Sequence, residues 1–266
     1  LSFEGTFEVN STIHTTGANG EVLYINGKVT LNAGAVLDSD NSVFICNDNA
    51  VLTMKPGSKV DSKINITKSG AKLYIDATGM NAGDIADITG TVTNSGNGTI
   101  AVVGSDKLEA KIVDGKIVLN SIVAKIGDAK FTSLQAAVNA VKAGETITVF
   151  EGTYAMPSMK AGITIGGEGD VVFEGTLTGT LENLTMKNIH IKGGNAQRWA
   201  YAKGDLVFEN VTFEATSVYA LHFDGIAAGT NLTYKNCTII GWAAMGGSPA
   251  SCVFEGCTIK DNGTYG

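Results

Sequence analysis

Four segments in the second half of the chain share one pattern, and this pattern most constrains the fold. They cover residues 184–191, 206–213, 232–239 and 252–259, so their starts lie 22, 26 and 20 residues apart. In each segment apolar residues alternate with polar ones up to an Asn or Gly, after which the apolar positions shift by one. A repeat of this length is typical of a solenoid, in which each coil contacts only its neighbours.

Alignment of the four segments turns sequence positions into columns. The two apolar columns are Leu184, Leu206, Leu232, Cys252 and Met186, Phe208, Tyr234, Phe254. The corner column is Asn188, Asn210, Asn236, Gly256. Parallel strands about 4.8 Å apart place the same position of successive segments one above the other, so the apolar columns fill the interior. Asn and Gly tolerate the left-handed backbone of a bend, and the Asn amides can bond to one another along the axis. We predict an all-β protein with a parallel β-helix in this half.

These segments resemble the right-handed parallel β-helix proteins of the pectate-lyase-like group, over roughly residues 124 to 266. The resemblance implies a calcium-dependent enzyme with clustered acidic residues and a basic side chain as base. Arg198 is the only arginine, and no Asp cluster recurs in successive coils near it. The lyase mechanism is therefore not supported. Asp38, Asp40 and Asp61 are expected in loops and could chelate calcium, but no calcium-loop motif supports this, so we predict no cofactor.

An amphipathic helix is predicted over residues 132–143, at the start of the β-helix. Thr132 and Gln135 match a capping box, and Gly144 can stop the helix. The apolar stripe consists of Leu134, Ala137, Val138 and Val141. This helix would shield the open end of the apolar columns from water. The segment also resembles the one that opens β-helix domains in large surface proteins of gut bacteria.

The N-terminal half repeats less clearly, since residues 30–39 match residues 53–62 at a spacing of 23. We predict a second β-solenoid-like domain there, with a sandwich of short strands as the alternative. Asp114-Gly115 lies between two alternating runs and predicts a tight hairpin that closes this domain. The expected domains are 1–122 and 123–266, with a linker near residues 120–125.

Composition excludes several classes of protein. The chain has 19 Lys+Arg against 26 Asp+Glu, a net charge of −7, which argues against nucleic-acid binding. No apolar run approaches the roughly 20 residues of a membrane helix. With 44% hydrophobic and 17% charged residues, the chain is not a disordered one. The Gly-, Thr- and Asn-rich composition is typical of secreted or surface proteins, and the resemblance to surface proteins of gut bacteria implies an extracellular location on the bacterial surface.

Ligands of a β-helix must bind on an outer face or in loops, because side chains fill the interior. Alignment of the longest stretches between the repeated segments places Trp199, Tyr219 and Trp242 in one column, with Ala200, Ala220 and Ala243 beside them. Facing outward, such aromatics form a flat platform for sugar rings. The predicted ligand-binding residues are Arg198, Trp199, Tyr201, Tyr219, His222, Asp224 and Trp242.

The alternative places these aromatics in the core. Strict alternation favours it for Tyr219, because Leu221 and Phe223 share its side of the strand. The same parity turns His222 and Asp224 outward together. An adjacent carboxylate orients an imidazole, so these two are weak candidates for an acid–base pair.

The four cysteines include no C-x-x-C pair. Cys237 and Cys257 occupy one column in neighbouring coils, so they could form a disulfide or remain two buried thiols. Cys46 and Cys252 stand at aliphatic positions, which favours thiols that act as small hydrophobes.

Three functions remain. The first is an adhesin-like module that binds a glycan or host surface ligand on the outer face of the β-helix. The second is a carbohydrate-active enzyme, a lyase or hydrolase that uses His222 and Asp224. The third is a structural stalk. The chain stops just after a coil strand without a visible cap, so we expect further coils and domains of the same chain.

Overall fold

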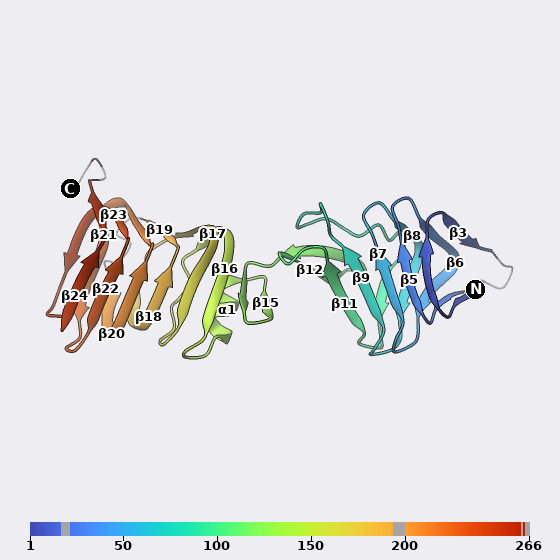
Figure 1. Ribbon diagram of the computed structural model, residues 1–266, viewed down its shortest axis with the longest axis horizontal. Coiled ribbons are helices and arrows are strands. Elements are labelled where there is room, and N and C mark those ends of the chain that lie inside the picture. The colour runs from blue at the N-terminus through green and yellow to red at the C-terminus, as the bar shows by residue number, and fades with distance from the viewer. Residues whose placement is uncertain (17–21, 194–199, 262, 264–266) are drawn as a thin grey trace. The chain divides into compact units, whose positions relative to one another are not determined.

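The structure is a computed structural model that describes residues 1–16, 22–193, 200–261 and 263. These residues form mainly β-strands and one short helix, α1 (Leu134–Ala140). The chain divides into two compact units, residues 1–121 and 122–266, in each of which parallel strands stack coil upon coil (Figure 1). The predicted solenoid fold is confirmed. The boundary between the units lies one residue before the expected one.

The first unit contains two parallel sheets. One consists of β1 (Ser2–Phe3), β4 (Leu23–Ile25), β6 (Val36–Ile45), β8 (Lys59–Ile66) and β10 (Val92–Asn94), with β3 (Thr12–Thr15) beside β6. The other consists of β2 (Thr6–Val9), β5 (Lys28–Leu31), β7 (Val51–Met54), β9 (Lys72–Asp76) and β11 (Thr99–Val103). Thr30 lies opposite Thr53 and Asp38 opposite Asp61, as the 23-residue repeat requires. Because successive coils pair in parallel, the sandwich alternative is wrong.

A hairpin follows these coils, formed by the antiparallel strands β12 (Leu108–Val113) and β13 (Lys116–Ser121). Its turn residues Asp114 and Gly115 have φ values of 49° and 75°, which a tight hairpin turn requires. The Nζ atom of Lys116 donates to three successive carbonyl oxygens, those of residues 88–90, at 2.9, 2.6 and 3.0 Å. The predicted hairpin is therefore present and anchored to the preceding loop.

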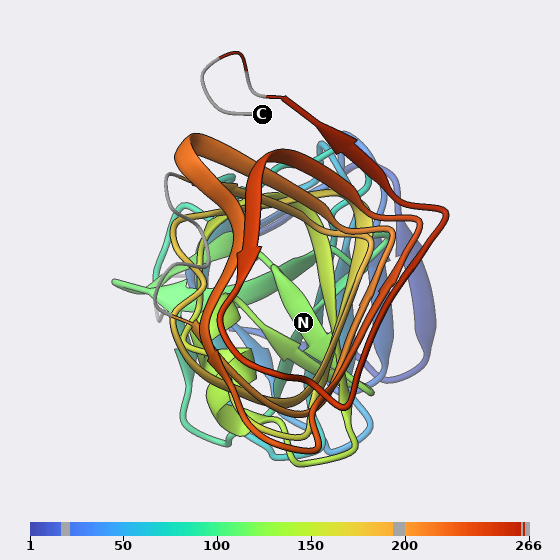
Figure 2. The ribbon, with the colours of Figure 1, turned by 90° about the vertical axis from the view of Figure 1, so that its left-hand side faces the viewer.

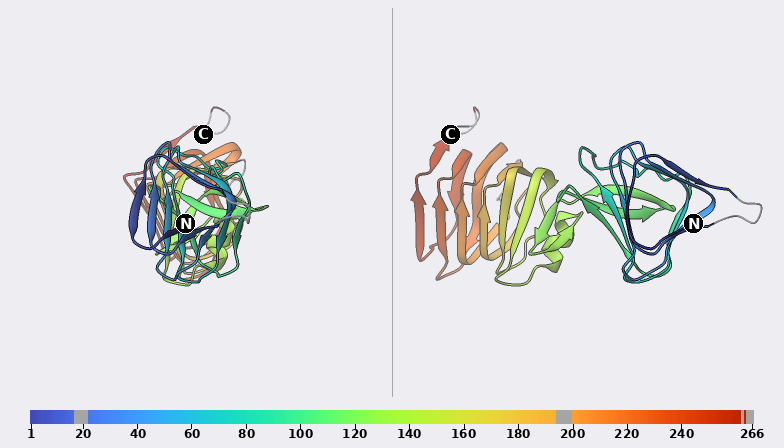
Figure 3. Two further views of the ribbon diagram at one scale, coloured as in Figure 1. Left: turned by 90° about the vertical axis from the view of Figure 1, so that its right-hand side faces the viewer. Right: turned by 45° about the vertical axis from the view of Figure 1, so that its right-hand side comes forward.

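The second unit is one long sheet that winds around its core. Its strands are β14 (Ala124–Ile126), β15 (Ala129–Phe131), β16 (Thr146–Ala155), β17 (Thr164–Glu174), β18 (Gly179–Lys187), β19 (His190–Gly193), β20 (Ala200–Glu209), β21 (Thr212–Ile226), β22 (Asn231–Lys235), β23 (Thr238–Met245), β24 (Ser251–Glu255) and β25 (Thr258–Lys260). β14 runs antiparallel to β15 and β16, and the other pairs are parallel. Figure 2 views these coils from the end that carries β24, and Figure 3 (right) shows them side by side.

The predicted sequence columns correspond to rows of side chains stacked from coil to coil. Leu184 lies opposite Leu206, the next partner is Leu232, and Cys252 follows. Phe208 and Tyr234 are fully buried, and their ring centroids lie 5.3 Å apart with planes inclined by 10°. Phe254 continues the row at 4.6 Å from Tyr234. We call Phe208, Tyr234 and Phe254 the inner aromatic stack.

The bends that follow this stack have the predicted left-handed backbone. The φ values are 53° at Asn188, 54° at Asn210, 51° at Asn236 and 64° at Gly256. The side-chain amide of Asn210 donates to the Oδ1 atom of Asn188 at 3.0 Å. The corner residues therefore turn the chain and also join neighbouring coils.

The helix α1 is shorter than predicted and has a different cap. Ser133 is the N-cap residue, and its Oγ atom accepts from the Ala136 N–H group at 3.4 Å. The side-chain Oε1 atom of Gln135 instead accepts from the Ser158 N–H group at 2.8 Å, so Thr132 and Gln135 form no capping box. The helix ends before Val141, which is extended. The apolar stripe is buried as predicted, and it packs against the core of the coils through Leu134, Ala137, Val138 and Val141.

Candidate functional site

An irregularity in β21 shapes the outer face of the second unit. The register between β21 and β23 shifts on both sides of Tyr219, which lies opposite Trp242. The next two residues, Ala220 and Leu221, are both fully buried, which regular alternation forbids. A bulge of this kind re-aims a side chain, and here it turns Tyr219 away from the core.

Tyr219 and Trp242 form a stacked pair on this outer face. Their ring centroids lie 5.2 Å apart with planes inclined by 16°, and Trp242 is 47% exposed. On its other side Tyr219 stacks on His222, at 4.4 Å and 17°. We call Trp242, Tyr219 and His222 the outer aromatic stack. The interpretation that places Tyr219 and Trp242 in the core is therefore wrong.

Tyr201, on β20, also lies on the outer face and is 47% exposed. It pairs with Gly225, and a Cβ atom at Gly225 would lie 2.2 Å from the Cε2 atom of Tyr201. The tyrosine ring therefore lies directly over Gly225, and a side chain at that position would have to displace it. At about 3.3 Å per residue, the six steps from Tyr219 to Gly225 form a strip shorter than 20 Å.

His222 and Asp224 lie between the two ends of this strip. The Nδ1 atom of His222 is 3.6 Å from the Oδ1 atom of Asp224, which is too long for a hydrogen bond. This nitrogen is buried and has no hydrogen-bond partner within the described part of the chain. The pair thus lacks the contact by which a carboxylate orients a catalytic imidazole.

Two of the predicted binding residues, Arg198 and Trp199, lie outside the described residues. The part of the predicted column that pairs Tyr219 with Trp242 is confirmed. The alignment of the alanines is wrong. Ala200 lies opposite Phe223, and Ala243 lies opposite Leu221, because the bulge in β21 offsets the alignment.

A second His–carboxylate pair lies on the second unit and was not predicted from the sequence. The Nε2 atom of His190 lies 2.8 Å from an oxygen of Glu214, and both side chains are half-buried. Lys192 lies 3.9 Å from the same carboxylate. His190 borders a shallow hollow of about 270 Å³ next to Asn188 and Asn210. The register between neighbouring coils could have predicted this pair, because it places residue 190 opposite residue 212 and so brings residue 214 within reach of residue 190.

The prediction that Asp38, Asp40 and Asp61 lie in loops is wrong, because β6 contains Asp38 and Asp40 and β8 contains Asp61. Two of these carboxylates bind protein groups. Asp38 contacts His14 at 2.6 Å, and Asp61 contacts Lys59 at 2.9 Å. Among the residues that the structure describes, no group of three or more His, Cys, Asp or Glu side chains is arranged to hold a metal ion. The described part of the chain also contains no helix long and apolar enough to span a membrane.

All four thiols are free. Burial raises the pKa of Cys237 to about 11, so this thiol is protonated at neutral pH. Cys237 and Cys257 lie in one column, since the Thr258 N–H group donates to the Cys237 carbonyl oxygen at 2.9 Å. Cys252 aligns with Leu232 as predicted but is exposed, because it belongs to the last described coil.

The stacked coils and their sheet topology define a parallel β-solenoid protein. Comparison with protein-family models, curated proteins and solved structures gave no match.

Proposed function

We propose that this chain is an extracellular, adhesin-like module of a bacterial surface protein, related to the pectate-lyase-like β-helices, that binds glycans on the outer face of its second unit. The outward-facing pair of Tyr219 and Trp242 carries this proposal. The composition and the resemblance of the repeated segments support the extracellular and bacterial assignment.

The chemistry of the strip suits a sugar. Tyrosine and tryptophan offer a rigid apolar face and a polar edge, which match the C–H face and the hydroxyl groups of a pyranose ring. Asp224, which is exposed, provides an acceptor beside the rings. Tyr201 marks the far end of the strip, so the site fits an oligosaccharide better than a single sugar.

A glycan array tests this proposal. The protein should bind a defined set of glycans, and Trp242→Ala and Tyr219→Ala should each weaken binding of those glycans roughly tenfold, the size of one lost aromatic contact. Tyr24→Ala is a matched control, because Tyr24 is an exposed aromatic residue of the first unit, at 42% against 47% for Trp242.

Other outcomes reassign the function. Depolymerisation of pectic or host glycans, abolished in His222→Ala, would make the chain a carbohydrate-active enzyme. Absence of both binding and depolymerisation would leave the structural stalk. Equal losses in Trp242→Ala and Tyr24→Ala would contradict a site on the second unit.

A further inference from the structure

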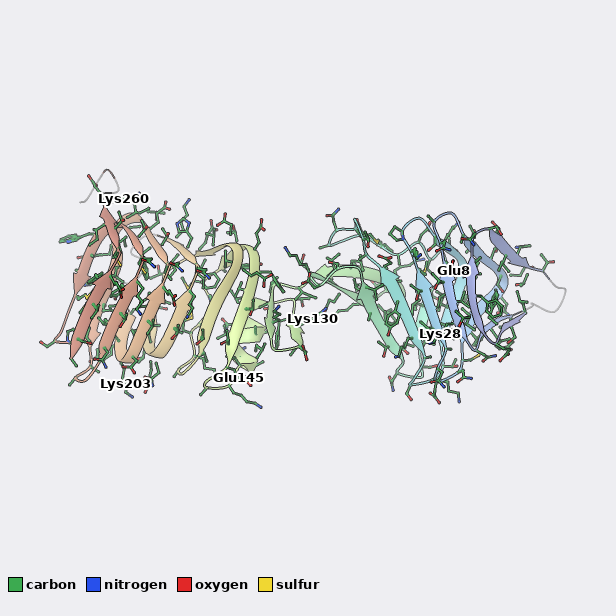
Figure 4. The ribbon with its side chains drawn as sticks, in the orientation of Figure 1. Glu8, Lys28, Lys130, Glu145, Lys203 and Lys260 are labelled. Carbon is green, nitrogen blue, oxygen red and sulfur yellow. The ribbon has the colours of Figure 1, made fainter. Side chains whose placement is uncertain are left out.

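Two lysines of the first unit share one outer column of side chains. Lys28 on β5 lies opposite Val51 on β7, and Val51 lies opposite Lys72 on β9 (Lys28 is labelled in Figure 4). The next residue on each of these strands is buried, so alternation turns the column outward. Two strand spacings of about 4.8 Å separate the lysines, so their positions lie about 10 Å apart with an apolar residue between them.

This column differs from a charged column of the second unit. There Lys187 lies opposite Glu209, and the two side chains form an ion pair at 2.8 Å. Within the described residues, neither Lys28 nor Lys72 forms an ion pair or a side-chain hydrogen bond. The first unit therefore presents two ammonium groups in one column, and the described part of the chain supplies no carboxylate to either.

A hollow of about 430 Å³ lies over this column. In the neighbouring outer column, Thr53 lies opposite Tyr74. Asp48 belongs to the loop before β7, and its Oδ1 atom accepts from the Gly70 N–H group at 3.1 Å. This hydrogen bond holds the carboxylate at the edge of the hollow. We call this surface the lysine hollow, which lies over Val51 and is lined by Lys28, Asp48, Asn49, Thr53, Lys72 and Tyr74.

The lysine hollow offers the groups that bind an anionic sugar chain. Val51 and Tyr74 provide apolar surface for the C–H face of a sugar ring. The Thr53 hydroxyl group and the Asp48 carboxylate can bond to sugar hydroxyl groups, and each ammonium group can bind a carboxylate. One sugar of an extended chain is about as long as one strand spacing. Two successive sugars therefore span the distance between the lysines.

We propose that the lysine hollow binds a glycan in which every second sugar carries a carboxylate. One carboxylate binds Lys28 and the next binds Lys72, and the uncharged sugar between them lies over Val51. An acidic peptide would use the two charges but would leave the hydroxyl and carboxylate groups of the hollow without matching sugar hydroxyls. This site lies on the first unit, so it is independent of the glycan site that we propose on the second.

Fluorescence anisotropy with a labelled hyaluronan octasaccharide tests the proposal, because in hyaluronan a glucuronate alternates with an uncharged sugar. The matched probe is the same octasaccharide with its carboxylates reduced to alcohols, and it should bind the 266-residue protein at least tenfold more weakly. The chain has a net charge of −7, so non-specific attraction cannot produce this preference for the charged probe. Raising the salt concentration should reduce the preference.

Variants of the protein locate the binding site. Lys28→Gln and Lys72→Gln should each weaken hyaluronan binding roughly threefold, and the double variant roughly tenfold, which is the size of exposed ion pairs. Lys63→Gln is the matched control, because Lys63 is an exposed lysine of β8 in the other sheet of this unit. It changes the net charge equally and should leave binding unchanged. Trp242→Ala should also leave hyaluronan binding unchanged, which separates this site from the one on the second unit.

Several results would overturn the proposal. These are equal affinity for the two probes, no binding of hyaluronan at millimolar concentration, and equal losses in Lys72→Gln and Lys63→Gln. A loss in Trp242→Ala without a loss in the lysine variants would assign hyaluronan to the second unit instead. Displacement of the labelled probe by hexaglutamate as effectively as by unlabelled hyaluronan would assign the lysine hollow to acidic peptides.

Discussion

The second unit carries two aromatic stacks, one inside the coils and one outside. Phe208, Tyr234 and Phe254 form the inner stack by regular alternation and an unbroken register. Tyr219 and Trp242 belong to the outer stack, which depends on the bulge in β21. Ring spacing is almost the same in both, at 5.3 Å between Phe208 and Tyr234 and 5.2 Å between Tyr219 and Trp242. The stacking geometry is therefore nearly the same in both stacks, and the stacks differ in how much of each ring is exposed to water.

Burial decides the energetic difference between the stacks. Phe208 and Tyr234 are fully buried, whereas Trp242 keeps 47% of its surface exposed. Full burial of a large apolar side chain stabilises a protein by about 1.5–3 kcal/mol relative to exposure. The inner stack thus contributes to folding, whereas about half of the Trp242 surface stays accessible, as the proposed glycan binding requires. The expected effects below follow this difference, from the largest to the smallest.

Truncation of the inner stack should have the largest effect. Phe208→Ala removes a fully buried ring and leaves a cavity between Met186 and Tyr234, so the free energy of unfolding should fall by about 3–5 kcal/mol. Urea denaturation with circular dichroism measures this change. A loss below 1 kcal/mol would contradict the placement of this ring in the core.

Substitution of the corner that follows the inner stack should have the next largest effect. Asn210 has a φ of 54° and donates to Asn188, so Asn210→Ala combines backbone strain with a lost hydrogen bond, at a cost of about 2–3 kcal/mol. Asn210→Gly keeps the backbone conformation and should cost about 1 kcal/mol. Thermal unfolding of both variants separates the cost of backbone strain from the cost of the lost hydrogen bond. Equal costs would show that the corner conformation is unstrained.

The hydroxyl group of Tyr234 is a weakness of the inner stack. This oxygen is buried and has no hydrogen-bond partner among the residues that the structure describes, and burial raises the pKa of Tyr234 well above its ordinary value. Tyr234→Phe keeps the ring and should raise the free energy of unfolding by about 1 kcal/mol. The urea midpoint of this variant measures the gain. A loss of stability would mean that the hydroxyl group has a partner in solution.

Removal of the exposed ring should have the smallest effect on stability. Trp242→Ala should change the free energy of unfolding by less than about 1 kcal/mol. About half of the Trp242 surface stays exposed to water in the folded protein, so folding buries little of this side chain. The same variant should weaken glycan binding roughly tenfold, so the substitution should affect binding more than stability. A stability loss as large as that of Phe208→Ala would remove the distinction between the two stacks.

The sequence predicts the inner stack because its register follows from the repeat alone. Leu206 and Phe208 recur as Leu232 and Tyr234 with the same corner two residues after the aromatic ring, so one alignment determines their neighbours. The hairpin at Asp114 and Gly115 is predicted for a similar reason, since two residues with positive φ specify the turn.

The outer site is less predictable. Alternation wrongly placed Tyr219 inside, because a bulge adds a residue that the sequence does not mark with Gly or Pro. The cap at Ser133 differs from the predicted Thr132 because Gln135 bonds to the distant Ser158 instead. His190 and Glu214 meet through a contact 24 residues apart in sequence, so neither residue type signals the pair on its own.

Exposure of Trp242 in solution is the most direct test of the difference between the stacks. The chain has two tryptophans, so Trp199→Phe leaves Trp242 as the only one. Its fluorescence in the folded protein should be readily quenched by iodide and acrylamide, and a bound glycan should protect it. Emission that resists both quenchers until the protein unfolds would place Trp242 in the core and contradict the outward-facing pair.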